Sequence, residues 1–195
     1  DKTKLICYPP EKQGNNYRIF DNVTSIEGNA FKGCASLTDI IIPDSVKSIG
    51  VGAFESCSSL KNITIPNGIK SISEYAFNDC ASLTNMTIPC GVTSIGYYAF
   101  SGCTNLVSII IPKTVTNIGW YAFNKCSGLS DITIPDSVLS IGERAFYECP
   151  RLTSITIPGS VTYIDRFAFG FYPDGKNFND NKYKSFKIYC YKGTD

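Results

Sequence analysis

Cysteines recur every 23 residues along most of this chain, and this regularity constrains its fold more than any other feature. Six of the nine cysteines keep the spacing without a slip, each with a phenylalanine three residues before it: Cys34, Cys57, Cys80, Cys103, Cys126 and Cys149. Periods of about 20 to 50 residues are typical of solenoids, in which each unit covers the apolar face of its neighbour. The chain is therefore predicted to be a repeat array.

Each repeat contains two extended segments joined by a proline turn. Leu37, Ile40 and Ile42 are expected to point inward from a first strand. Pro43 ends that strand because proline has no N–H to donate, and a second short strand is expected around residues 46–49. The same residue types return in each of the following repeats, which predicts two rows of parallel strands.

A glycine bend and an Ala-Phe pair complete each repeat. We expect the glycines to adopt a positive φ, which costs little only for this residue; they are Gly50, Gly96, Gly119 and Gly142. The Ala-Phe pair is expected to carry a buried ring on a short helical turn that closes the coil. Seven coils can be counted from the phenylalanines, which are Phe31, Phe54, Phe77, Phe100, Phe123, Phe146 and Phe169.

These residues together resemble a known family. The run Ile-Pro-x-x-Val-x-x-Ile-Gly-x-x-Ala-Phe-x-x-Cys-x-x-Leu-x-x-Ile is similar to the leucine-rich repeat of BspA-like bacterial surface proteins, the treponemal-type subclass, over about residues 17–170. The resemblance implies a right-handed leucine-rich repeat superhelix with a main parallel β sheet, a second row of short strands and short helical turns. It also implies a secreted or cell-surface protein that binds host proteins, other cells or matrix.

We expect one domain over residues 1–195. Residues 1–22 resemble an N-terminal cap or degenerate coil, in which Phe20 stands where the family has proline, and residues 23–170 hold the regular repeats. Residues 171–195 are expected to form a C-terminal loop and a partial cap strand, with Cys190 where the family usually has glycine.

The composition narrows the range of partners. The chain is 43% hydrophobic and 18% charged, which suits a folded domain, and its 18 Lys and Arg nearly balance 17 Asp and Glu. A net charge of +1 provides no field for nucleic acid or an anionic membrane, and no apolar run approaches the length of a membrane span. The chain begins at Asp1 without a leader, so we expect any signal peptide to have been removed or left out.

Catalysis and metal binding have little support. The chain has no histidine, which excludes a Ser-His-Asp triad and a Cys-His pair, and it has no Cys-x-x-Cys zinc pattern. Asp39 and Asp131 share a repeat position, but four coils of about 4.8 Å separate them by about 19 Å, too far for a pair of catalytic carboxylates. We expect no enzyme activity, no metal and no cofactor.

The cysteines fall into two groups. The periodic six are expected to be free, buried thiols, because in-register stacking gives poor geometry for disulfides between neighbours. Cys90 instead occupies the exposed turn after Pro89, where it is either a reactive thiol or a neutral substitution.

Two surfaces vary between repeats and are candidates for binding. The first follows the outward positions of the first strands and includes Asn62, Asn85 and Asp131; its small polar residues would suit either a docking surface or an ordinary exposed strand. The second follows the glycine bend and gathers Tyr75, Tyr97, Tyr98, Trp120 and Tyr121. These rings would form either a binding patch for protein or glycan or a ladder that packs on itself.

We therefore predict an extracellular or cell-surface binding module for adhesion or protein recognition. Its expected partner is an extracellular protein or matrix ligand, and we expect a monomer. Two alternatives stay open at this point: a passive spacer in a cell-envelope protein, and glycan binding through the aromatic patch.

Overall fold

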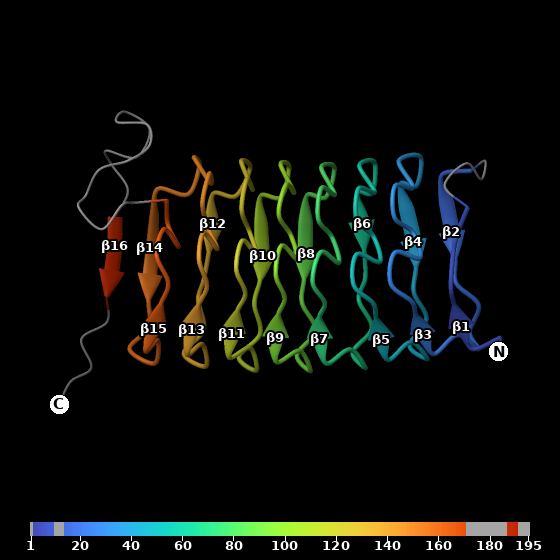
Figure 1. Cartoon of the computed structure of the whole chain (residues 1–195), viewed down its shortest axis with the longest axis horizontal. Helices are drawn as coiled ribbons and strands as arrows, with labels where there is room; N and C mark the ends of the chain where they lie inside the picture. Colours follow the sequence, from blue (N-terminus) through green and yellow to red (C-terminus); the bar gives the residue numbers. More distant parts are fainter. Residues whose placement is uncertain (1, 10–13, 171–186, 191–195) are drawn as a thin grey trace.

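A computed structural model describes residues 2–9, 14–170 and 187–190. It shows an elongated solenoid with residues 2–9 and 187–190 at opposite ends, and the strands form two rows that run along its length (Figure 1). Most of the predicted C-terminal loop and cap within residues 171–195 lies outside the described residues, which include only 187–190 of it.

The first row consists of one strand from each successive coil. Its members are β2 (Asn16–Arg18), β4 (Asp39–Ile41), β6 (Asn62–Ile63), β8 (Asn85–Thr87), β10 (Ser108–Ile110), β12 (Asp131–Ile132), β14 (Ser154–Ile157) and β16 (Lys187–Cys190). Hydrogen bonds join them in parallel as β2-β4-β6, β8-β10-β12 and β14-β16. The register follows the repeat, since Ile109 lies opposite both Met86 and Ile132.

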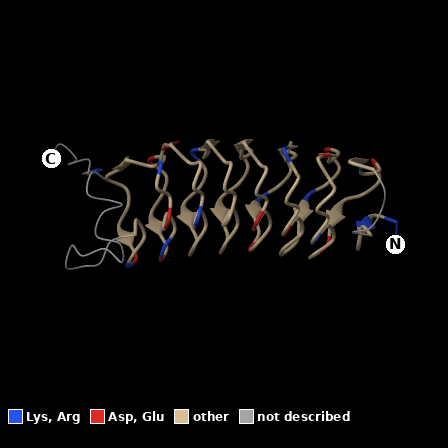
Figure 2. Ribbon diagram, turned by 90° about the horizontal axis from the view of Figure 1, so that it is seen from above, with Lys and Arg blue, Asp and Glu red and all other residues tan. Residues whose placement is uncertain are grey.

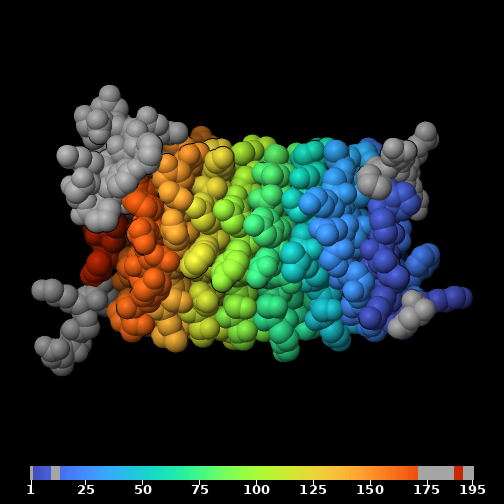
Figure 3. Space-filling view, viewed as in Figure 1, coloured from blue at the N-terminus to red at the C-terminus, as the bar shows by residue number. Residues whose placement is uncertain are grey.

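The second row contains shorter strands. They are β1 (Lys4–Leu5), β3 (Ser25–Ile26), β5 (Ser48–Ile49), β7 (Ser71–Ile72), β9 (Ser94–Ile95), β11 (Asn117–Ile118), β13 (Ser140–Ile141) and β15 (Tyr163–Ile164). These pair in parallel as β1-β3-β5 and as β7-β9-β11-β13-β15. The two predicted rows are thus confirmed, and the surface in view shows the coils as bands in chain order (Figure 3).

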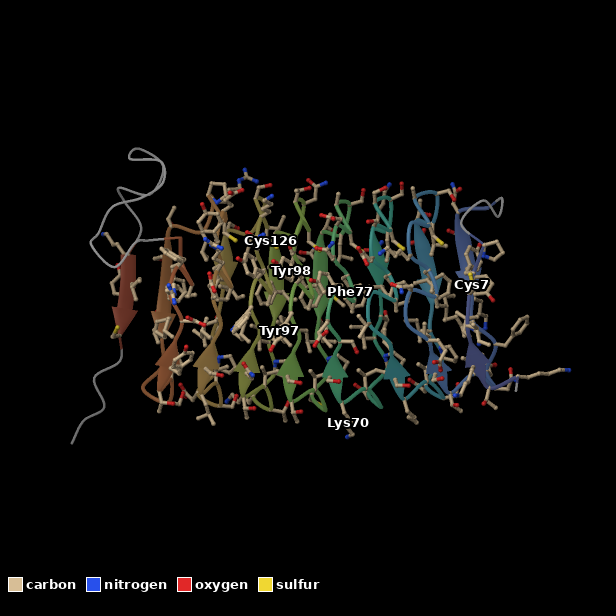
Figure 4. All side chains as sticks on the ribbon, viewed as in Figure 1. Cys7, Lys70, Phe77, Tyr97, Tyr98 and Cys126 are labelled. Carbon is tan, nitrogen blue, oxygen red and sulfur yellow. The ribbon has the colours of Figure 1, made fainter. Side chains whose placement is uncertain are left out.

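A column of stacked phenylalanines forms the centre of the core. Successive rings from Phe54 to Phe169 lie 5.3–5.7 Å apart with interplanar angles of 1–7°, and Phe77 is labelled among them in Figure 4. Tyr8 extends the column at its N-terminal end, 5.2 Å from Phe31. Tyr8 lies 23 residues before Phe31, so it occupies the repeat position of the phenylalanines, although it was not predicted as a member of the column.

The periodic cysteines link each coil to the one before it. The Cys57 thiol donates a hydrogen bond to the carbonyl of Phe31 at 3.0 Å, and Cys80, Cys103, Cys126 and Cys149 repeat this contact at 3.1–3.2 Å. All six are buried free thiols, as predicted. Burial raises the pKa of Cys57 to about 12, which keeps this thiol protonated and unreactive near neutral pH.

The bend glycines do not adopt the predicted positive φ. They are required instead because neighbouring coils approach closely: a Cβ on Gly96 would lie 2.7 Å from the backbone nitrogen of Glu74, and one on Gly119 would lie 2.8 Å from the carbonyl carbon of Gly96. Positive φ occurs two residues later, at Gly52 and Tyr75 among others. The position of the bend glycines was therefore predicted correctly, but the predicted reason, a positive φ, was wrong.

The closing segment consists of tight turns and not of the predicted short helical turns. No helix occurs in the three described stretches of the chain. Two left-handed residues in each coil, such as Gly52 and Ser56, interrupt any right-handed helix. The freed N–H groups bond to the next coil, as when Phe54 donates to the carbonyl of Ala76 at 2.9 Å.

Candidate functional site

A row of depressions follows the first row of strands. Three adjoining depressions of about 380, 370 and 320 Å³ form it; the first extends from Asn62 to Ile110, the second from Ser108 to Asp136, and the third from Asp131 to Pro158. Adjacent depressions share lining residues, so we treat them as one surface and call it the strand groove. The predicted Asn62, Asn85 and Asp131 all line it and are all exposed.

The strand groove combines a polar column with an apolar side chain. The Ser108 hydroxyl donates to Asn85 Oδ1 at 3.2 Å, which links two neighbouring coils of the polar column. Ile110 is 64% exposed, and Thr87 lies beside it in register. An exposed isoleucine among amides, hydroxyls and a carboxylate can anchor an apolar side chain of a partner while the rim forms hydrogen bonds.

Three tyrosines at the bend form a stacked column. Tyr75 and Tyr98 lie 4.9 Å apart and Tyr98 and Tyr121 lie 4.5 Å apart, both pairs at 5°. The Arg144 guanidinium continues the column 5.6 Å from the centre of the Tyr121 ring and donates to the Tyr121 hydroxyl. Both faces of Tyr98 and Tyr121 are therefore covered, and burial raises the pKa of Tyr98 so that its hydroxyl stays protonated.

Tyr97 and Trp120 form a second stacked pair beside this column. Their ring centres lie 5.4 Å apart at 17°, and the side chains are 45% and 48% exposed; Tyr97 and Tyr98 are labelled in Figure 4. Trp120 also lies against Gly142, where an added Cβ would meet its Cδ1. The five predicted aromatic residues thus come together, but they mostly cover one another's faces.

The tyrosine column has an unusual backbone that the sequence analysis did not predict. Tyr75, Tyr98 and Tyr121 have φ values of 56°, 53° and 57°, in the left-handed region that disfavours bulky side chains. Asn29 and Gly52 occupy the same repeat position with φ of 59° and 63°. Asparagine and glycine are the residues that tolerate this conformation best, so their presence at this repeat position could have predicted the positive φ.

Cys90 lies where the sequence placed it. Its thiol is free and exposed, and its backbone carbonyl accepts a hydrogen bond from the Thr114 hydroxyl at 2.9 Å. Whether this thiol is reactive stays a prediction.

In the described part of the chain, charged side chains are dispersed along the solenoid. Blue and red segments are scattered along the ribbon in Figure 2. Within residues 2–9, 14–170 and 187–190, no three His, Cys, Asp or Glu side chains are grouped to hold a metal ion. The described part of the chain also has no helix with the length and apolar character needed to cross a membrane.

The fold and the repeat define a class: this is a parallel β solenoid of about 23-residue coils, built from leucine-rich repeats. The description "BspA type Leucine rich repeat region" matches residues 11–127 and 93–195, with six copies of the repeat. The chain belongs to this family, whose members are typical of bacterial cell surfaces.

Solved structures agree with this assignment. A leucine-rich repeat protein of T. pallidum is 30% identical with a TM-score of 0.74, over 79% of this chain and 74% of that one. One from Bacteroides ovatus is 28% identical with a TM-score of 0.76, over 90% of this chain and 59% of that one. A leucine rich cell surface protein of Faecalibacterium prausnitzii is 29% identical with a TM-score of 0.51, over 89% and 60% of the two chains.

The match thus spans about three-fifths of the length of the last two proteins. A comparison with curated proteins finds no match. Leucine-rich repeat scaffolds of this kind are generally non-enzymatic, and they act through their surfaces.

Proposed function

We propose that this chain is an extracellular, surface-held binding module that recognises a protein or matrix ligand through the strand groove. One observation supports this most directly: three depressions that share lining residues follow one another across five coils, from Asn62 to Pro158. Affinity would be distributed over several repeats, as is usual for the extended surfaces of solenoid proteins.

The contrast with the aromatic patch favours the strand groove for protein recognition. The patch rings cover one another, so they present mainly edges to a partner. Ile110, in contrast, is the most exposed large apolar side chain in the regular repeats and stands in the middle of the groove. An isolated anchor within a polar rim is a common arrangement at binding hot spots.

A cell-surface location is part of the proposal. It is supported by the family and by the F. prausnitzii relative, which is described as a cell surface protein.

The test uses the full chain, immobilised and exposed to a panel of purified collagens and matrix glycoproteins. We expect at least one of them to bind, and we expect binding to fall about tenfold in a variant with Asn62→Ala, Asn85→Ala and Asp131→Ala. The matched control is Tyr97→Ala with Trp120→Ala on the other surface, which should bind as the wild type does.

Two results would contradict the proposal. If no protein of the panel binds, the chain acts as a spacer. If the aromatic double variant loses binding while the triple variant keeps it, recognition occurs at the bend and not in the groove.

A further inference from the structure

A second exposed isoleucine shares the repeat position of Ile110. Ile41 is 55% exposed and Ile110 is 64% exposed, and they lie at the outward ends of the first-row strands β4 and β10. The two coils between them, which contain β6 and β8, carry Thr64 and Thr87 at this position (Figure 1). Two apolar side chains thus lie three coils apart on one face, and we call them the anchors.

Each anchor lies in a depression of the surface. Ile110 lines the first two depressions of the strand groove. Ile41 lines a fourth depression of about 420 Å³, together with Arg18, Pro43 and Asp44. An aliphatic side chain of a partner can therefore bury apolar surface against either anchor.

The spacing of the anchors matches an extended polypeptide. Coils about 4.8 Å apart place Ile41 and Ile110 about 14 Å apart along the solenoid. In an extended chain, residues i and i+4 point to the same side and lie about 14 Å apart, at about 3.4 Å per residue. An α-helix rises about 1.5 Å per residue and returns to one face after about 10 Å and about 16 Å, so it fits this spacing less well.

The coils between the anchors carry groups that pair with a peptide backbone. Among the described residues, the Asn62 side chain has no hydrogen-bond partner, and Asn85 uses only its Oδ1, which accepts from Ser108 at 3.2 Å. An asparagine side chain has the same donor and acceptor groups as a peptide unit, so it can bond to the C=O and the N–H of a strand that crosses it. The middle of this face therefore suits the backbone of a bound segment.

Carboxylates stand at both ends of this face. The coil of the first anchor exposes Asp39 and Asp44, and the coil after the second anchor exposes Asp131 and Asp136. The whole chain has a net charge of +1, yet the side chains that line the four depressions include more carboxylates than cations. These charged residues are Arg18, Lys113, Asp21, Asp44, Asp131 and Asp136. The local excess of negative charge favours a partner with lysine or arginine outside its two aliphatic residues.

We infer that this face binds an extended, basic polypeptide segment in which two aliphatic residues four positions apart contact Ile41 and Ile110. The segment runs along the solenoid and crosses the first-row strands, its backbone bonds to Asn62 and Asn85, and its lysine or arginine residues pair with the carboxylates at the two ends. The inference rests on the proposed function, because it names the kind of protein segment that the strand groove recognises, and it extends that surface to the depression at Ile41.

The experiment measures binding of synthetic peptides to the full chain by fluorescence anisotropy. The probe is an end-capped, fluorescein-labelled peptide with the core Lys-Ile-Thr-Ser-Thr-Ile-Lys, and we expect a dissociation constant of about 100 μM or lower. The matched control has the core Lys-Ile-Thr-Ser-Ile-Thr-Lys. Its composition is the same, but its second isoleucine points to the opposite side of the strand, so it should bind about tenfold more weakly.

Substitutions in the chain test the same contacts. Ile41→Ala and Ile110→Ala should each weaken binding of the probe by about fivefold to tenfold, while Leu139→Ala, which shortens an exposed side chain beside the second row, should leave it unchanged. Asp44→Asn combined with Asp136→Asn should weaken binding about threefold and reduce its dependence on salt. All of these positions are exposed, so the variants should fold, and circular dichroism checks that they do.

Three results would overturn the inference: neither peptide binds, both bind equally, or the probe binds Ile41→Ala as tightly as the wild type. A matrix protein that binds through the strand groove but is not displaced by the probe would overturn the inference and leave the proposed function standing. A probe that binds with the expected spacing preference while no protein of the panel binds would support the inference and contradict only the matrix partner of the proposed function.

Discussion

The chain carries two columns of stacked side chains, one inside the solenoid and one at its surface. The inner column runs from Tyr8 through Phe169 with an aromatic ring in every coil. The outer column reads Asn29, Gly52, Tyr75, Tyr98, Tyr121, Arg144 and Phe167, all at positive φ. Both columns share the spacing of the coils, but only the inner one holds the same kind of residue, an aromatic ring, in every coil.

The difference shows which positions must hold one kind of residue for the coils to stack and which positions can hold several kinds. An inner ring is enclosed on all sides, so any change in its volume leaves a cavity or a clash. An outer residue has to tolerate a left-handed backbone, but the side chains of Tyr75, Tyr98 and Tyr121 are only partly buried, so they are less constrained than the inner rings. The residues at the outer positions and in the strand groove can therefore vary without loss of the fold.

The largest expected effect is in the inner column. Phe100→Ala should lower the free energy of unfolding by about 3–5 kcal/mol, because the ring is fully buried between two stacked neighbours. Urea denaturation followed by circular dichroism measures it. The matched surface change, Tyr98→Ala, should cost only about 1 kcal/mol, and equal losses at the two positions would remove the distinction between the columns.

The bend glycines should show the next largest effect. Gly96→Ala forces a Cβ against the backbone of residues 72–74, so we expect a loss of about 1–3 kcal/mol in the same assay. A glycine needed only for its φ would give a smaller loss. Wild-type stability in this variant would show that the coils can separate at the bend without cost.

The sequence predicted the inner part of this structure well because each inner position has one task. The 23-residue period gave the coils, the two rows and the buried thiols. The φ of the bend could not be predicted from the glycines, because close approach of two coils and a positive φ both select glycine, and the residue type alone does not distinguish them.

The surface was harder to predict from the residue types alone. The residues of each candidate surface do lie together, and their role in binding stays a prediction. The covering of Tyr98 by its neighbours depends on side-chain directions that the repeat pattern does not contain. The strand groove likewise needed the exposed position of Ile110, which the pattern assigned only to a strand face.

Alkaline pH should lower the free energy of unfolding through the buried cysteines. The buried Cys57 has a pKa of about 12 against 9.0 for a free thiol, so above pH 9 the unfolded state loses protons that the folded state retains. Its stabilisation is full below pH 9 and falls between pH 9 and 12, by about 1.4 kcal/mol per pH unit. Denaturation curves across this range should fall less steeply in Cys57→Ala, and parallel curves would contradict the assignment.

The smallest stability effect should lie in the outer column. Tyr98→Gly removes two ring contacts but relieves the left-handed strain, so it should be more stable than Tyr98→Ala by about 1 kcal/mol. Thermal unfolding of the two variants compares them directly. If the alanine variant is the more stable one, the positive φ at this position is not what limits the choice of residue.

The central claim is that the surface recognises a ligand while the interior only supports it, and a pair of matched substitutions tests this most directly. Ile110→Asp in the strand groove and Leu139→Asp beside the second row each place a charge on an exposed apolar position, 64% and 50% exposed in the native chain. We expect equal unfolding free energies for both. The Ile110→Asp variant should bind the matrix protein identified in the panel about tenfold more weakly than the Leu139→Asp variant does. Equal binding by the two variants would contradict the claim.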